Sequence, residues 1–107
     1  MSEFHALSVA SQLRQQQWPG AAKITPAYQG NELAGEAGEA CNVIKKLERE
    51  RLGIAGSRDT VEHLAEELGD VIICVDMIAT TYGIDLWEAV KAKFNATSRK
   101  GGMDVFL

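Results

Sequence analysis

Residues 32–47 decide the fold of this chain, and they read ELAGEAGEACNVIKKL. Apolar side chains recur in this stretch at intervals of three and four residues, which is the spacing of one face of an α-helix. That apolar stripe consists of Leu33, Ala37, Ala40, Ile44 and Leu47. The pattern predicts an amphipathic helix whose apolar face packs against another element.

A second stripe runs along the same helix at the edge of the expected core. It consists of Glu32, Glu36, Glu39, Val43 and Lys46. Carboxylates three or four residues apart repel one another and destabilise a helix unless a cation lies between them. The spacing therefore indicates that this edge of the helix binds a cation.

Residues 59–82 repeat this arrangement. Their apolar stripe consists of Leu64, Leu68, Val71, Ile72, Val75 and Ile78, and the stripe beside it of His63, Glu66, Glu67, Asp70, Cys74 and Met77. If the two helices pack antiparallel, four carboxylates converge on one groove: Glu36, Glu39, Glu67 and Asp70. Unpaired charges in such a place cost roughly several kcal/mol each. Magnesium, which prefers oxygen ligands, would remove that cost.

The acidic stripes have two other interpretations. The first is a helical oligomer whose acidic faces are simply solvated, because single glutamates are mostly exposed. The second is a di-iron carboxylate bundle, which needs a Glu-x-x-His motif on each of two helices, and the sequence does not favour it. Neither His5 nor His63 has a glutamate three residues before it.

Glycines and prolines divide the chain into four expected helices, over residues 3–17, 31–52, 59–82 and 85–99. The stretch 18–31 contains both prolines, so we expect an irregular loop that carries function. Asp59 and Asp85 each precede a glutamate by three residues, which is capping-box spacing. Gly53 and Gly83 are expected to close the helices before them. The pattern favours an all-α, four-helix bundle.

Composition sets further limits. The 107 residues are 46% hydrophobic and carry a formal net charge of −4, so we expect one folded domain over residues 1–107 and no nucleic-acid binding. The most apolar run is too short to span a bilayer, and no signal-peptide pattern opens the chain. Cys41 and Cys74 are expected to be reduced, buried thiols. Together these features predict a cytoplasmic protein without membrane contact.

Three segments carry a family resemblance: ELAGEAGEA at 32–40, EELGDV at 66–71 and YGIDL at 82–86. Together they resemble the MazG-like all-α nucleoside triphosphate pyrophosphohydrolases, whose signature is an E-x-x-E pair, a spacer and an E-x-x-D pair. Glu36 and Glu39 match the first pair, and Glu67 and Asp70 match the second. The resemblance covers roughly residues 25 to 100. Many members have a second glutamate where this chain has Gly35, and Glu32 is the candidate to replace it.

The resemblance implies a MazG-like bundle completed by homo-oligomerisation, as a homodimer or homotetramer. It implies magnesium-dependent hydrolysis of (deoxy)nucleoside triphosphates to monophosphate and pyrophosphate, for house-cleaning or nucleotide-pool control, with manganese as a substitute metal. Glu36, Glu39, Glu67 and Asp70 are then the metal ligands and the catalytic residues. Glu36 or Glu39 is the candidate to accept a proton from the attacking water.

Other side chains are expected to bind the substrate. Trp18, in the loop before the acidic helix, is the preferred contact for the base, because an aromatic ring packs well on a planar group. The candidate phosphate contacts are Lys46, Lys93, Asn95, Arg99 and Lys100, and the last four resemble the Lys/Asn/Arg-rich end of the family's final helix.

Two rival functions remain at this stage. The first is a phosphoribosyl-ATP pyrophosphohydrolase, which shares the fold and the chemistry. The second is a non-enzymatic helical interaction module with a solvated acidic stripe. Asp76 interrupts an apolar helix, and its role is open between a subunit interface and a hydrogen bond to a base.

Overall fold

Helices account for all regular structure in residues 2–107, the part of the chain that the computed structural model describes. The elements are α1 (Glu3–Gln17), the 3₁₀ turn η1 (Ala21–Lys23), α2 (Pro26–Arg51), α3 (Val61–Thr81) and α4 (Leu86–Lys100). The all-α fold class expected from the sequence is therefore confirmed. Within residues 2–107, no helix has both the length and the apolar character needed to cross a bilayer.

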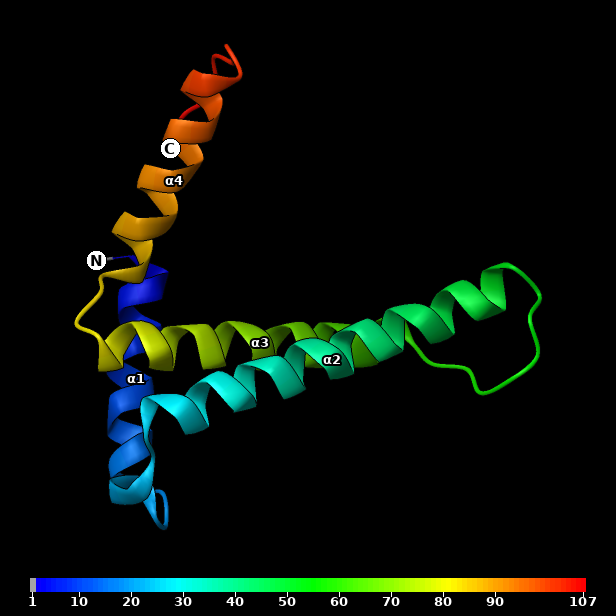
Figure 1. The fold of residues 1–107 in the computed structure, drawn as a ribbon, viewed down its shortest axis with the longest axis horizontal. Helices are drawn as coiled ribbons and strands as arrows, with labels where there is room; N and C mark the ends of the chain where they lie inside the picture. The colour runs from blue at the N-terminus through cyan, green and yellow to red at the C-terminus, as the bar shows by residue number, and fades with distance from the viewer. Residues whose placement is uncertain (1) are drawn as a thin grey trace.

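The two longest helices form the centre of the structure. α2 and α3 lie side by side and antiparallel, joined at one end by the loop 52–60 (Figure 1). α1 crosses α3 near the other end of the pair, and α4 extends away from it after contacting α1. The Phe4 and Trp87 rings stack between α1 and α4 with their centroids 5.9 Å apart. The surface between α2 and α3 is therefore the place where the acidic stripes meet.

The buried face of α2 differs slightly from the expected apolar stripe. Ala40 and Val43 are 5% and 2% exposed, whereas Ile44 is 45% exposed. The sequence pattern placed Val43 on the acidic stripe, so α2 is rotated about its axis towards that stripe. This rotation brings the carboxylates of α2 closer to α3 than a strictly apolar contact face would.

α2 begins five residues earlier than expected. Pro26 occupies its first turn, and the hydroxyl of the N-cap residue Thr25 accepts a hydrogen bond from the Tyr28 N–H at 3.2 Å. Proline is favoured in the first turn of a helix, where its missing N–H has no intrahelical acceptor to lose. The expectation of an irregular loop up to residue 31 was therefore wrong, and only residues 18–25 lie between α1 and α2.

The start of α3 also differs from the capping-box prediction. Thr60, not Asp59, is the N-cap, and its hydroxyl accepts from the His63 N–H at 3.1 Å. The Asp59 carboxylate accepts instead from the Thr60 N–H at 2.8 Å, which leaves it able to contact the His63 ring. Asp85 is confirmed as the N-cap of α4, because its carboxylate accepts from the Glu88 N–H, whereas the Glu88 carboxylate pairs with Lys91.

The two cysteines are free thiols with different environments. Cys74 is partly buried on α3, but Cys41 is exposed, so the expectation of two buried thiols was wrong for Cys41. Successive residues are about 100° apart around a helix. Cys41 therefore turns away from the interface that buries its neighbour Ala40.

Asp76 is the most completely buried side chain, with an exposed fraction of 0%. It lies where α1 crosses α3, and the Ser8 hydroxyl donates to its Oδ1 at 2.5 Å. Its other oxygen, Oδ2, is buried without a hydrogen-bond partner. A hydrogen bond to a charged group contributes about 1.5–3 kcal/mol, and more is lost when the group is left unpaired.

Replacing Ser8 by alanine is therefore expected to lower the free energy of unfolding by about 1.5–3 kcal/mol, because it leaves both Asp76 oxygens buried and unpaired. Urea denaturation measures the change. The matched control is the same Ser8→Ala change in an Asp76→Val background, where no carboxylate needs the hydroxyl and the loss should disappear. Equal losses in both backgrounds would show that the hydrogen bond does not stabilise this crossing.

Candidate active site

Three carboxylates from the two long helices form a cluster. One oxygen each of Glu36, Glu67 and Asp70 lies within 4.8 Å of the other two. Glu67 and Asp70 are three residues apart on α3 and so lie on the same side of that helix. Glu36 reaches them from α2, which runs antiparallel. The structure thus brings together three of the four predicted ligands.

Glu39, the fourth predicted ligand, lies beside this cluster and is exposed. Partial burial raises the pKa of Glu36, and the negative charges of Glu39, Asp70 and Glu67 raise it further. Burial and Glu39 likewise raise the pKa of Glu67, against an opposing effect of His63. The carboxylates are therefore close enough to repel one another, and Glu39 is part of that repulsion.

Two oxygens in the cluster have no partner among residues 2–107. Glu36 Oε2 and Glu67 Oε2 are shielded from solvent and make no hydrogen bond. Leaving a buried polar atom unpaired costs about 1–3 kcal/mol, and more for a charged group. A divalent cation would satisfy both oxygens and remove the repulsion. A donor set made only of carboxylate oxygens is the type that magnesium prefers.

A hydrogen-bonded network supports the cluster from one side. The His63 ring contacts Asp59 Oδ1 through Nδ1 at 2.8 Å and Glu67 Oε1 through Nε2 at 3.0 Å. The Lys46 ammonium lies 3.9 Å from Asp59 Oδ2. Sequence reasoning missed this role of His63, although its spacing of four residues from both acids was a usable signal. Lys46, predicted to bind phosphate, is instead paired with Asp59.

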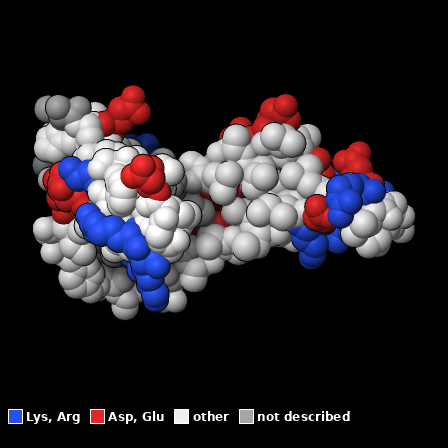
Figure 2. All heavy atoms as spheres, turned by 90° about the horizontal axis from the view of Figure 1, so that it is seen from above, with Lys and Arg blue, Asp and Glu red and all other residues white. Residues whose placement is uncertain are grey.

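Glu36 and Asp70 of the cluster line a cleft of about 460 Å³, the acidic cleft. The residues that define it are Trp18, Tyr28, Glu32, Glu36, Asp70 and Cys74. Acidic side chains lie deep in the hollow of the molecule, and the visible Lys and Arg gather mainly towards its two ends (Figure 2). Burial, followed by the charges of Glu32, Glu36 and Asp70, raises the pKa of the Cys74 thiol.

The acidic cleft also contains residues that can contact a substrate. Trp18, the predicted contact for the base, lies on its wall and is 61% exposed, so its ring is available for contact. Arg14 of α1 also lines the cleft, and sequence reasoning missed it. Its signal was weak, because an arginine near the C-terminus of a helix is usually explained by the helix dipole.

The predicted phosphate contacts on α4 do not reach the cluster within one chain. Lys93, Asn95, Arg99 and Lys100 lie on the helix that extends away from the α2–α3 pair (Figure 1). The Asn95 amide instead donates to the carbonyl of Leu107 at 3.1 Å and accepts from its N–H at 2.8 Å. The Arg99 guanidinium lies 5.8 Å from the centre of the Phe106 ring. The C-terminal tail thus folds back on α4.

The pKa shifts predict how the stability of the metal-free protein depends on pH. The folded state raises the pKa values of Glu36 and Glu67 above 4.5 and that of His63 above 6.5. Between about pH 5 and pH 8, folded chains therefore hold more protons than unfolded chains, so the stability of the metal-free protein falls as pH rises. Thermal melting in a chelator should give a lower Tm at about pH 8 than at about pH 5.

Added magnesium should raise the Tm most at the higher pH, where the carboxylates are ionised. Glu36→Gln is the matched variant, since it removes one of the shifted groups and should weaken the pH dependence. A Tm that rises steadily with pH in the chelator would contradict the arrangement of charges described above.

Comparison with known families gives one match. Residues 25–100 match the model of the family described as "MazG nucleotide pyrophosphohydrolase domain", which is about seven tenths of the chain. Neither the curated proteins nor the solved structures give a significant match. The matched range contains all of the acidic cluster and the whole of α2, α3 and α4.

Proposed function

The chain belongs to the MazG nucleotide pyrophosphohydrolase family, and we propose that it hydrolyses (deoxy)nucleoside triphosphates between the α and β phosphates to a monophosphate and pyrophosphate. The observation that carries the proposal is the cluster of Glu36, Glu67 and Asp70, two members of which, Glu36 and Asp70, line a cleft large enough for a nucleotide. In this proposal residues 1–107 form one MazG-like domain that acts in the cytoplasm, in house-cleaning or in control of nucleotide pools.

Glu36, Glu67 and Asp70 would hold magnesium, or manganese in its place, through one oxygen each. The unpartnered Oε2 atoms of Glu36 and Glu67 support this assignment. When bound, the metal supplies the positive charge that an anionic triphosphate needs beside three carboxylates. Without that charge, the cleft would repel the substrate.

Glu39 is best placed to accept the proton from the attacking water. It contacts Glu36 and Glu67, yet it is not one of the three residues whose oxygens converge, so in this proposal it is not a metal ligand. Its exposure gives a water molecule access. A carboxylate held beside the reacting phosphorus can take that proton as the water attacks. Glu36, the other candidate from the sequence, is occupied as a ligand in this arrangement.

Two residues of the acidic cleft would position the rest of the substrate. The Trp18 ring offers a flat apolar surface for the sugar or base. The Arg14 guanidinium offers donors to phosphate oxygens that face away from the cluster. Both residues lie outside α2 and α3, so the substrate would touch α1 and the loop that follows it.

We also propose that the functional form is a homodimer or homotetramer. Ile44, Leu68 and Ile72 are apolar residues on the central helices, yet each is 45–49% exposed in the single chain. A second copy would cover such a face. The predicted phosphate contacts on α4 lie away from the acidic cleft of their own chain. In this proposal they serve the acidic cleft of a neighbouring copy: Lys93, Asn95, Arg99 and Lys100.

A product assay tests the function. The purified chain is incubated with ribo- and deoxyribonucleoside triphosphates, and separately with phosphoribosyl-ATP, in magnesium, in manganese or in chelator. Monophosphate and pyrophosphate in equal amounts, formed only with metal, are expected. Release of single phosphates would contradict the proposal. Turnover of phosphoribosyl-ATP alone would favour the rival pyrophosphohydrolase, and no heat of magnesium or triphosphate binding would favour the interaction module.

A further inference from the structure

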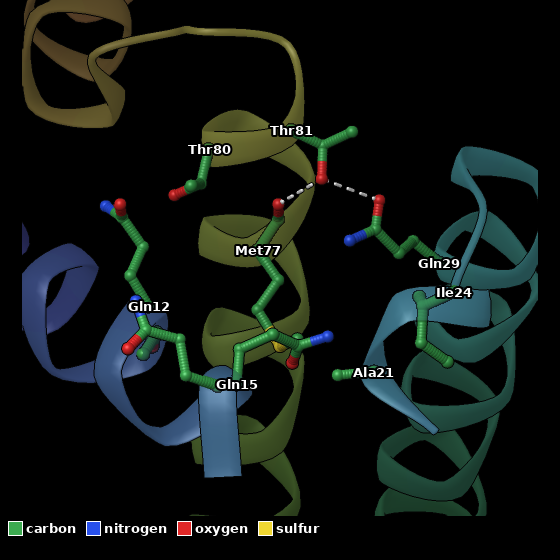
Figure 3. A pocket seen from close by; sticks show the side chains of 10 residues that line it. Gln12, Gln15, Ala21, Ile24, Gln29, Met77, Thr80 and Thr81 are labelled. Carbon is green, nitrogen blue, oxygen red and sulfur yellow. Dashed lines mark hydrogen bonds between the residues drawn. The ribbon is translucent and has the colours of Figure 1, made fainter. Parts of the chain in front are cut away.

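A second cleft, the amide cleft, adjoins the acidic cleft and differs from it in chemistry. Figure 3 shows the side chains that line it. It has a volume of about 300 Å³ and lies between α1, η1, α2 and α3. Four residues, Ser11, Gln15, Ile24 and Met77, line both clefts. The two clefts are therefore neighbouring parts of one groove, and a ligand anchored in the first can extend into the second.

The lining of the amide cleft combines polar groups with the apolar side chains of Ala21, Ile24 and Met77, and none of its described residues carries a charge. Its polar groups are the amides and hydroxyls of Ser11, Gln12, Gln15, Gln16, Gln29, Thr80 and Thr81. A phosphate would find no cation here. A flat neutral group with N–H and C=O groups on its edge suits this lining, since glutamine amides pair well with the edges of nucleobases.

Gln29 is the best-fixed of these amides. Its side chain is buried, with 8% exposed, and its Oε1 accepts a hydrogen bond from the Thr81 hydroxyl at 2.9 Å. The same hydroxyl lies 3.0 Å from the carbonyl oxygen of Met77, one helical turn earlier. In this orientation the amide nitrogen of Gln29 points into the cleft (Figure 3). Gln29 therefore presents a hydrogen-bond donor to any ligand there.

Ser11 gives an independent sign that the groove takes a polar ligand. It is 7% exposed and lines both clefts, yet its hydroxyl oxygen has no hydrogen-bond partner among residues 2–107. A buried hydroxyl without a partner costs about 1–3 kcal/mol. Its position at the junction of the two clefts places it beside the part of a ligand that would connect them.

The distance between the two clefts suits one nucleotide. Gln29 precedes Glu36 by seven residues on α2, and Met77 follows Asp70 by seven on α3. Seven residues of helix rise about 10 Å. A phosphate at the carboxylates and a base at Gln29 would thus be separated by an interval that the sugar bridges. Trp18, on the wall of the acidic cleft, lies beside that bridge.

We propose that the amide cleft holds the nucleobase of the substrate and that Gln29, held by Thr81, distinguishes between bases. This inference rests on the proposed function and adds the substrate class. The Gln29 amide nitrogen donates to the carbonyl oxygen at position 4 of a uracil-type pyrimidine. Cytosine has an amino group at that position, and two donors would face each other. Uridine-type triphosphates are therefore the favoured pyrimidine substrates.

The test compares kcat/KM for dUTP and dCTP, whose bases differ in the group at position 4 and in the proton on the adjacent ring nitrogen. The wild-type protein should favour dUTP by about tenfold or more. Gln29→Glu replaces the donor by an acceptor of the same shape, so the dUTP:dCTP ratio should fall by about tenfold or more. Thr81→Val frees the amide to turn and should lower the ratio by about threefold.

Inorganic triphosphate serves as a ligand without a base, and its inhibition constant should be the same for the wild type and Gln29→Glu. Folding of each variant is checked by circular dichroism. If Gln29→Glu does not fold, the dUTP:dCTP ratio of Thr81→Val is compared with that of the wild type instead. A wild-type preference for dCTP, or a ratio that neither variant alters, would overturn the role of Gln29. If the wild type hydrolyses no nucleotide, the proposed function fails, and calorimetric affinities for dUTP and dCTP then test the cleft by the same ratios.

Discussion

Changing Asp70 to asparagine is expected to lower the rate of pyrophosphate release more than about a hundredfold at saturating magnesium. Loss of a residue that only supports a metal ligand typically costs 10–100-fold in metal affinity or activity, and loss of a ligand should exceed that. Asp70 is one of the three carboxylates whose oxygens converge. Glu36→Gln and Glu67→Gln should have similar effects, since each removes one oxygen ligand.

The fold of Asp70→Asn should remain intact. Asp70 is exposed, and its charge raises the pKa of Glu36 by repulsion, so neutralising it relieves a destabilising contact in the metal-free protein. Its Tm in chelator should equal or exceed that of the wild type. The matched control is Glu66→Gln, a neutralised carboxylate one turn earlier on α3 that lies outside the cluster. Activity retained in Asp70→Asn, or lost equally in Glu66→Gln, would contradict the assigned site.

Replacing His63 by alanine is expected to raise the magnesium concentration needed for half-maximal activity by about 10–100-fold. His63 Nε2 binds Glu67 Oε1 at 3.0 Å, which leaves Glu67 Oε2 for the cation. Without the ring, the Glu67 carboxylate is free to rotate. Magnesium binding must then order this side chain, which lowers the affinity. At saturating magnesium, the loss in kcat should be much smaller than the loss in affinity.

Asp59 offers a graded version of the same test, because it holds the other nitrogen of the His63 ring at 2.8 Å. Asp59→Asn should give a smaller loss of magnesium affinity than His63→Ala. His5→Ala, on α1, is the matched control and should leave magnesium affinity unchanged. If all three variants show the magnesium dependence of the wild type, His63 does not position Glu67, and the hydrogen bonds described here serve only the start of α3.

Much of the site follows from the spacing of a few residues. The pairs Glu36/Glu39 and Glu67/Asp70, each beside an apolar stripe, predicted that carboxylates from two helices would meet, and the structure brings three of the four within 4.8 Å of one another. The substrate residues were less predictable. Trp18 lines the acidic cleft, but Lys46 pairs with Asp59, and the four residues of α4 lie away from it. A positive charge in a sequence does not show which negative charge it will meet.

The sequence by itself determined that there are four helices and which residue types are available at the acidic edge of the two central ones. These are local properties, set by the 3.6-residue repeat and by capping groups within a few residues. Tertiary structure decided the rest: Val43 is buried in place of Ile44, Glu39 stays outside the convergent three, and His63 supports Glu67. The rotation and offset of one helix against another depend on both surfaces packing at once, and no single stripe contains that information.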